Sequence, residues 1–146
     1  MAAVFSVAMP PKLEEIERLA GSIDGWCTDA GIPPKTAYEI NLMLDELITN
    51  TVSYGFADGR QGQIWVRIEE IADSQLRITL TDDAPPFNPI SHDDPDIDAD
   101  IEHRRIGGLG IYFVKQLSES IEYLDLGTGN ELRLIDRYGD RINDPA

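Results

Sequence analysis

The side chains best suited to take part in chemistry are Glu46 and Asn50, which stand four positions apart in the stretch from Met43 to Gly55. Apolar residues around them recur at steps of three and four, which predicts one buried face of an α-helix: Ala37, Ile40, Leu44, Leu47, Ile48 and Thr51. On that helix the pair would stack about 40° apart around the axis, beside the buried face. They could serve as a proton acceptor and an oxygen ligand, although such pairs are also ordinary on exposed helices.

Asp82 is a third candidate, because it continues the alternating series of inward-facing residues in a predicted strand. Two alternating runs after the Asp58-Gly59 turn predict paired strands, with inward residues Ile64, Val66 and Ile68, then Leu76, Ile78 and Leu80. Asp82 keeps the parity of the second run, so we expect it on the buried face of the sheet. A carboxylate there needs a partner, which can be protein, water or ligand.

A glycine-rich segment, Gly107-Gly108-Leu109-Gly110, stands where a loop is expected to become a helix, directly after Arg104, Arg105 and Ile106. Glycines let backbone N–H groups approach an anion closely, and the positive end of a helix favours negative charge. The segment matches neither the phosphate loop GxxxxGK[ST] nor a dinucleotide fingerprint, and glycines also serve tight turns. On the helix that follows, we expect one face to hold Leu109, Phe113, Leu117 and Ser120.

The remaining elements complete one domain, expected over residues 1–140, with a flexible tail at 141–146. Residues 3–9 are expected to form an edge strand, and residues 13–30 a helix that ends at Gly31. Pro33 and Pro34 suit the first turn of the helix that carries Glu46, and Gly55 suits its end. Residues 121–126 and 131–138 are expected to form a closing hairpin around the turn from Gly127 to Asn130.

Composition narrows the classes of partner. The net charge of −15 opposes direct nucleic-acid binding and attracts basic protein surfaces. No apolar run approaches the ~20 residues of a membrane span, and the N-terminus lacks the pattern of a signal peptide. The single cysteine, Cys27, lies on an apolar helical stripe, so we expect a packed thiol and a cytoplasmic location.

The stretch from Ile90 to Ile106 is strongly acidic: Asp93, Asp94, Asp96, Asp98, Asp100 and Glu102. A calcium loop counted from Asp96 would need glycine at its sixth position and glutamate at its twelfth, where this chain has Ile101 and Gly107. His92 and His103 show no metal-ligand spacing. We therefore expect a mobile, solvated loop.

Three segments in order, Glu46 to Asn50, Asp82 to Phe87 and Gly107 to Gly110, together resemble the GHKL ATPases, whose ATP-binding module is called the Bergerat fold. The short length of the chain and the residues of the three segments look most like those of the anti-sigma-factor serine kinases. The resemblance implies an α+β fold: a two-layer α/β sandwich with three helices on one face of a mixed, mostly antiparallel sheet. ATP would bind between the layers.

The resemblance also implies a role for each candidate residue. Asn50 would ligate Mg²⁺, Asp82 would accept a hydrogen bond from the adenine amino group, and Glu46 would be the general base. Ala84 stands where many relatives have glycine, and Phe87 would brace the pocket. The amides of Gly107, Gly108, Leu109 and Gly110 would cradle the phosphates, supplemented by Arg104 and Arg105, and the acidic loop would be the ATP lid.

Three functions remain open from the sequence. The first is a serine/threonine kinase that acts as an anti-sigma factor, binds a sigma factor and phosphorylates a STAS-type antagonist. The second is an ATP-binding regulatory module that binds protein partners without catalysis, and the third is a structural domain that binds no nucleotide. Retention of Glu46 favours the kinase. Relatives of this type act as dimers, and the first strand offers an edge for pairing.

Overall fold

The computed structural model describes residues 3–90 and 106–138. Its sheet contains β1 (Val4–Met9), β2 (Ile64–Ala72), β3 (Gln75–Asp82), β4 (Ser120–Asp125) and β5 (Asn130–Arg137), in the order β1-β2-β3-β5-β4. The predicted α+β class is confirmed. All pairings among the described strands are antiparallel, where a mixed, mostly antiparallel sheet was expected.

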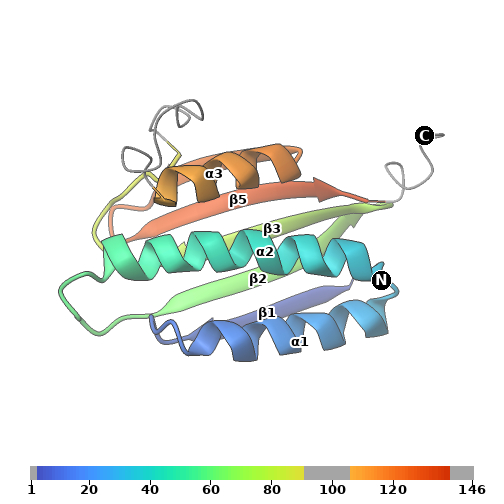
Figure 1. Ribbon diagram of the computed structural model, residues 1–146, viewed down its shortest axis with the longest axis horizontal. Coiled ribbons are helices and arrows are strands. Elements are labelled where there is room, and N and C mark those ends of the chain that lie inside the picture. The colour runs from blue at the N-terminus through green and yellow to red at the C-terminus, as the bar shows by residue number, and fades with distance from the viewer. Residues whose placement is uncertain (1–2, 91–105, 139–146) are drawn as a thin grey trace.

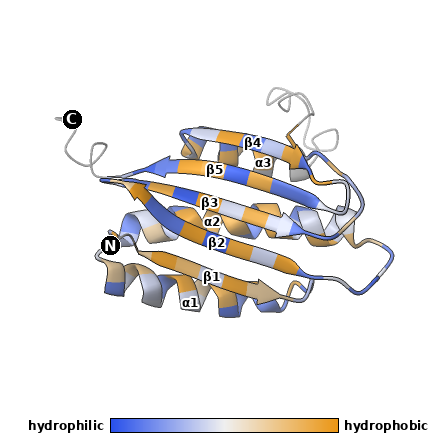
Figure 2. Ribbon diagram, turned by 180° about the vertical axis from the view of Figure 1, so that it is seen from behind, coloured by the Kyte–Doolittle hydropathy of each residue, from blue (hydrophilic) through white to orange (hydrophobic). Residues whose placement is uncertain are grey.

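Three helices form the second layer: α1 (Glu15–Ala30), α2 (Pro34–Asn50) and α3 (Ile106–Leu117). They cover one face of the sheet, with α2 between α1 and α3 (Figure 1). The opposite face carries no helix of the described chain, and its strands alternate between polar and apolar residues (Figure 2). None of the described helices is long and apolar enough to cross a bilayer.

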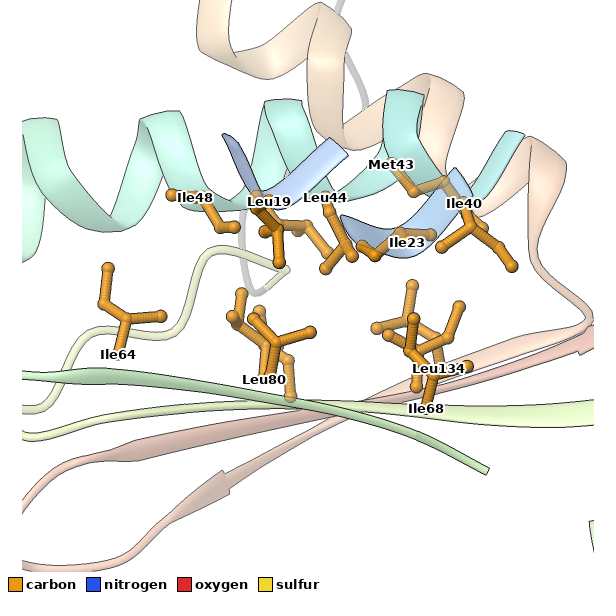
Figure 3. Packing of buried hydrophobic residues seen from close by; sticks show 14 of the residues in the cluster. Leu19, Ile23, Ile40, Met43, Leu44, Ile48, Ile64, Ile68, Leu80 and Leu134 are labelled. Atoms are coloured by element: carbon orange, nitrogen blue, oxygen red, sulfur yellow. The ribbon is translucent and has the colours of Figure 1, made fainter. Parts of the chain in front are cut away.

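The core lies between the layers, where side chains of α1 and α2 meet the inward residues of the sheet (Figure 3). The helical face predicted around Glu46 is buried throughout, from Ala37 to Thr51. The alternation predicted for β2 and β3 is also confirmed, because Ile64, Ile78 and their inward neighbours are buried. Cys27 is buried, and burial, with a smaller effect of Asp24, raises the pKa of its thiol to about 11. The packed thiol expected from the sequence is therefore confirmed.

The ends of α1 and α2 follow the predicted signals. Gly31 terminates α1 in the left-handed conformation, with φ 76°. Pro34 occupies the first turn of α2, which ends at Asn50 and continues into a single π-helical turn, Thr51–Gly55. Such turns are rare and often occur at functional sites. The predicted end at Gly55 is therefore the end of the whole helical run.

The face predicted for α3 is confirmed at Leu117, which packs against the core, but it is wrong at Phe113 and Ser120. Phe113 is 54% exposed and Ser120 belongs to β4, whereas Ile111, Val114 and Ser118 are buried. Both sets fit a helical period, so spacing alone could not choose between them. The helix ends at Leu117, and the Ser118 hydroxyl donates a 2.8 Å hydrogen bond to the carbonyl of Val114 before the chain enters β4.

Two predicted segments lie outside the described residues. One is the acidic stretch, of which residues 91–105 include His92, His103, Arg104 and Arg105. The other is the tail, with residues 139–146. The lid, the arginine contacts and the domain limits stay predictions.

Candidate functional site

Asp82 ends β3 on the buried face of the sheet, where its side chain is 7% exposed. Its Oδ1 accepts hydrogen bonds from the backbone N–H of Ala84 at 2.9 Å and from Nδ2 of Asn130 at 2.8 Å. Within the described part of the chain, Oδ2 accepts none. Burial raises the pKa of Asp82 and Asp83 adds to this, whereas the two hydrogen bonds act in the opposite direction. One oxygen of an inward carboxylate is thus left for a ligand.

Asn130 opens β5 directly opposite Asp82 and is 5% exposed. Beyond Asp82, its Nδ2 approaches the carbonyls of Pro85 at 3.1 Å and Ala84 at 3.3 Å. Its Oδ1 accepts from the Phe87 N–H at 2.8 Å and the Tyr123 hydroxyl at 2.5 Å. Asn130 is not among the residues predicted from the sequence, where it falls in an expected hairpin turn. Strand alternation could have indicated it, because Asn130 continues the series of the buried residues Leu132 and Leu134 and is therefore a polar residue on the buried face.

A narrow cleft opens at this end of the sheet, with a cavity volume of about 10 Å³. Three segments contribute its lining: Asn50, Thr51 and Gly55; Asp82, Phe87 and Pro89; and Tyr123, Asn130 and Leu132. The structure thus brings together three of the predicted residues, Asn50, Asp82 and Phe87. Ala84 does not line the cleft, is buried beside it, and contributes the N–H that Asp82 accepts.

Phe87 is half-buried and stacks on Tyr54, with ring centroids 5.5 Å apart and an interplanar angle of 26°. Tyr54 belongs to the π-helical turn that follows Asn50 and is 59% exposed. The pair therefore joins the turn after α2 to the turn after β3, across the margin of the cleft. Tyr54 is not among the residues predicted from the sequence.

Glu46 lies one turn before Asn50 on α2 and reaches the glycine-rich start of α3. A Cβ built on Gly110 would overlap Oε2 of Glu46 and lie 2.9 Å from its Cδ, so the carboxylate packs directly on this glycine. Gly107 to Gly110 lie within the first turns of α3, which begins at Ile106. The predicted general base thus adjoins the predicted phosphate-binding segment, although it is not part of the cleft lining.

The described residues contain no group of three or more histidine, cysteine, aspartate or glutamate side chains that could hold a metal ion. The Asn50 side chain is 7% exposed, lines the cleft and makes no hydrogen bond within the described chain. A buried amide without a partner is an available oxygen donor. It fits Mg²⁺, which keeps several waters and binds substrate phosphates beside one or two protein ligands.

Solved structures share this fold. The crystal structure of the RsbU and RsbW domains of Rv1364c from Mycobacterium tuberculosis matches 92% of this chain and 32% of that chain, with a TM-score of 0.66 and 14% identity. The histidine kinase domain of the EL346 blue-light activated histidine kinase from Erythrobacter litoralis matches 91% of this chain and 63% of that chain, with a TM-score of 0.55 and 20% identity. At these identities the likeness concerns the fold alone.

Curated relatives match by sequence. The serine-protein kinase RsbW of Listeria monocytogenes is 26% identical over 128 residues, which cover 84% of this chain and 81% of the relative. The blue-light-activated histidine kinase 2 of Erythrobacter litoralis is 29% identical over 90 residues, covering 62% of this chain and 23% of the relative. Residues 9–135 match the family described as the histidine kinase-like ATPase domain, and the chain belongs to that family.

Proposed function

We propose that the chain is an ATP-dependent serine/threonine protein kinase that acts as an anti-sigma factor and phosphorylates a STAS-type anti-sigma-factor antagonist. The observation that carries the proposal is the position of Glu46. Its carboxylate packs on Gly110, at the glycine-rich start of α3, one turn away from the unpartnered amide of Asn50. The proposed proton acceptor, oxygen ligand and backbone N–H groups would therefore converge where α2 meets α3.

The nucleotide would bind with its adenine at the Asp82 end of the cleft. Oδ2 of Asp82 would accept a hydrogen bond from the adenine amino group, and Phe87 would brace the base. The N–H groups at the start of α3 would hold the phosphates, because they point out of the helix and its positive end favours anions. Asn50 would hold Mg²⁺, which when bound neutralises the charge of the phosphate oxygens.

Phosphoryl transfer needs little further chemistry from the protein. A substrate hydroxyl oxygen would form the new bond to the γ-phosphorus, while the bond from that phosphorus to the β–γ bridging oxygen breaks. Glu46 would take the hydroxyl proton, and ADP would leave with the bridging oxygen. Positioning and charge neutralisation dominate such reactions.

The serine/threonine specificity is supported by the curated RsbW relatives, which are named serine-protein kinases and align over 84% of this chain. The sigma factor and the STAS antagonist are supported by the resemblance of the three sequence segments to anti-sigma-factor kinases. The net charge of −15 favours partners with basic surfaces.

The test of catalysis is incubation with labelled ATP and purified STAS-domain proteins from the same genome. One of them should become labelled on serine or threonine, and Glu46→Gln should slow labelling by about 10²- to 10⁴-fold, the usual contribution of a general base. Asp45→Asn is the matched control, because Asp45 is the adjacent acid on α2 and is exposed. It should label at the wild-type rate.

Three outcomes would contradict parts of the proposal. A Glu46→Gln variant as fast as wild type removes Glu46 as the base. A wild type that binds a STAS partner with ATP but never transfers phosphate indicates the non-catalytic regulatory module instead. For the anti-sigma role, calorimetry against purified sigma factors should reveal one that binds, and binding by none contradicts it.

A further inference from the structure

We infer that Asn130 is a positioning residue for adenine recognition, because its amide holds the Asp82 carboxylate and the turn from Ala84 to Phe87 as one unit. The inference rests on the proposed ATP binding and deepens it, by adding a residue that determines base specificity. No contact between Asn130 and the base is needed. Its effect passes through Asp82.

The amide of Asn130 is engaged on both sides. Nδ2 donates to Oδ1 of Asp82 at 2.8 Å, with the carbonyls of Pro85 and Ala84 at 3.1 and 3.3 Å. On the other side, Oδ1 accepts from the Phe87 N–H at 2.8 Å and the Tyr123 hydroxyl at 2.5 Å. One side chain thereby joins the end of β3, the turn that follows it and β4.

These partners permit only one orientation of the amide. The Phe87 N–H is an obligatory donor, so it requires the oxygen of Asn130 on its side. A flipped amide would place its NH₂ group against that donor and its oxygen against the Asp82 carboxylate. The nitrogen is therefore held toward Asp82. Together with the Ala84 N–H, it occupies Oδ1 and leaves Oδ2 as the acceptor available to the base.

The backbone also holds Asn130 close to Asp82. A Cβ built on Gly129 would overlap the carbonyl oxygen of Asp82 and lie 3.0 Å from Cα of Asp83. The chain entering β5 thus passes directly against the end of β3, which only glycine permits. The short Asn130 side chain can then reach the carboxylate without an intervening water.

The charge of Asp82 depends on this contact. The titratable group that acts on the pKa of its carboxyl is Asp83, the residue after β3, and Asp82 in turn raises the pKa of the Tyr123 hydroxyl from β4. On the helix side the cleft presents the neutral side chains of Asn50 and Thr51. Against the burial that raises the pKa of Asp82, the Asn130 hydrogen bond favours the ionised form. An ionised Asp82 can only accept, which suits an amino group.

The test compares Asn130→Asp with Asn41→Asp. Asn41 offers a matched control because its Nδ2 also donates to an aspartate, Asp24 Oδ1 at 3.0 Å, on the helical layer. Binding of Mg·ATP and Mg·GTP is measured by calorimetry across a pH series, and the Asp82 carboxyl is titrated by NMR without nucleotide. Asn130→Asp should lower ATP affinity at neutral pH by about tenfold to a hundredfold, the usual cost of losing a hydrogen bond to a charged group.

GTP affinity should change less than ATP affinity, and the Asp82 carboxyl should titrate at a higher pH than in wild type. Asn41→Asp should change none of these. If Asn130→Asp does not fold by circular dichroism, Tyr123→Phe decides, because it removes one donor that holds the amide and should lower the ATP-over-GTP preference by about fivefold.

A folded Asn130→Asp variant with the wild-type preference and the wild-type titration of Asp82 overturns the inference. If Asn130→Asp does not fold, an unchanged ATP-over-GTP preference in Tyr123→Phe overturns the inference. A wild type that binds neither nucleotide overturns the proposed function instead, so the two failures are distinguishable.

Discussion

The Glu46 carboxylate rests on Gly110 so closely that one added methyl group at position 110 would overlap Oε2. The contact joins the C-terminal part of α2 to the start of α3. It also sets the position of the proposed base relative to the backbone N–H groups that would hold phosphate. Both the close approach of the helices at this point and the proposed catalysis therefore depend on having glycine, with no side chain, at position 110.

Gly110→Ala should displace the Glu46 carboxylate at little cost in stability, because the overlapping atoms are the far end of a flexible side chain. It should also slow phosphorylation of a STAS partner, because Glu46 must move. Gly25→Ala on α1 is the control, since a Cβ there meets nothing within 4 Å. That change should stabilise by about 0.5–1 kcal/mol, as glycine is unfavourable inside helices. Denaturant unfolding measures the stability of both variants and labelled ATP measures their activity, and a Gly110→Ala variant that phosphorylates as fast as wild type would refute a role for this contact in placing Glu46.

Asn50→Ala should abolish Mg²⁺-dependent ATP binding while the protein stays folded, because the proposed metal has one protein ligand. Asn41→Ala, another asparagine of α2, removes an amide far from the cleft and should bind as wild type. Calorimetry with and without Mg²⁺ distinguishes the two variants. An Asn50→Ala variant with undiminished Mg²⁺ dependence would exclude Asn50 as the ligand.

Asp82→Asn should increase stability at neutral pH and weaken the preference for adenine over guanine. Burial raises the folded pKa of Asp82 above its ordinary value of 3.8. Between these two values the folded protein binds more protons than the unfolded one, so stability falls as pH rises through this window. Asparagine does not titrate, so the variant does not lose this stability as the pH rises. Thermal unfolding over a pH series would show a flatter dependence of its stability on pH. A variant less stable than wild type at neutral pH contradicts this assignment.

Phe87→Ala should weaken ATP and GTP binding alike, by about fivefold if the lost contact is worth about 1 kcal/mol. A brace contacts any purine, whereas Asp82 distinguishes bases. Phe113→Ala is the control, since Phe113 also contacts a tyrosine, Tyr112 on α3, edge-on with centroids 5.7 Å apart. A selective loss of ATP binding in Phe87→Ala would give Phe87 a different role.

A homodimer would form through β1, which lies at the edge of the described sheet and pairs only with β2 there. Val4 on this strand is 45% exposed. We expect a dimer by light scattering at micromolar concentration, and Val4→Lys should shift it toward monomer. Leu126→Lys, at the similarly exposed Leu126 after β4, should leave it unchanged. A wild-type monomer removes this prediction without affecting the kinase.

Local patterns predicted the features that depend on local geometry. The helical period placed Leu44 and Ile48 in the core, and the strand period placed Asp82 on the inner face. The contact of Glu46 with Gly110 could not be predicted in this way, because it depends on how two helices approach each other. The strand period could have placed Asn130 on the inner face, but not beside Asp82, Ala84 and Pro85, which lie 45 to 48 residues earlier and meet it only through the pairing of β3 with β5.

That sheet order has a consequence for synthesis. A nascent chain that has emerged as far as Gly110 already contains all three sequence segments that identify the family, yet β3 still has an open edge. Asp82 acquires Asn130, and the cleft acquires Tyr123 and Leu132, only after the last hairpin has left the ribosome. Nucleotide bound in this cleft, as we propose, would therefore assist only the final stage of folding. A chain stalled before residue 130 would keep its motifs but lack the completed cleft.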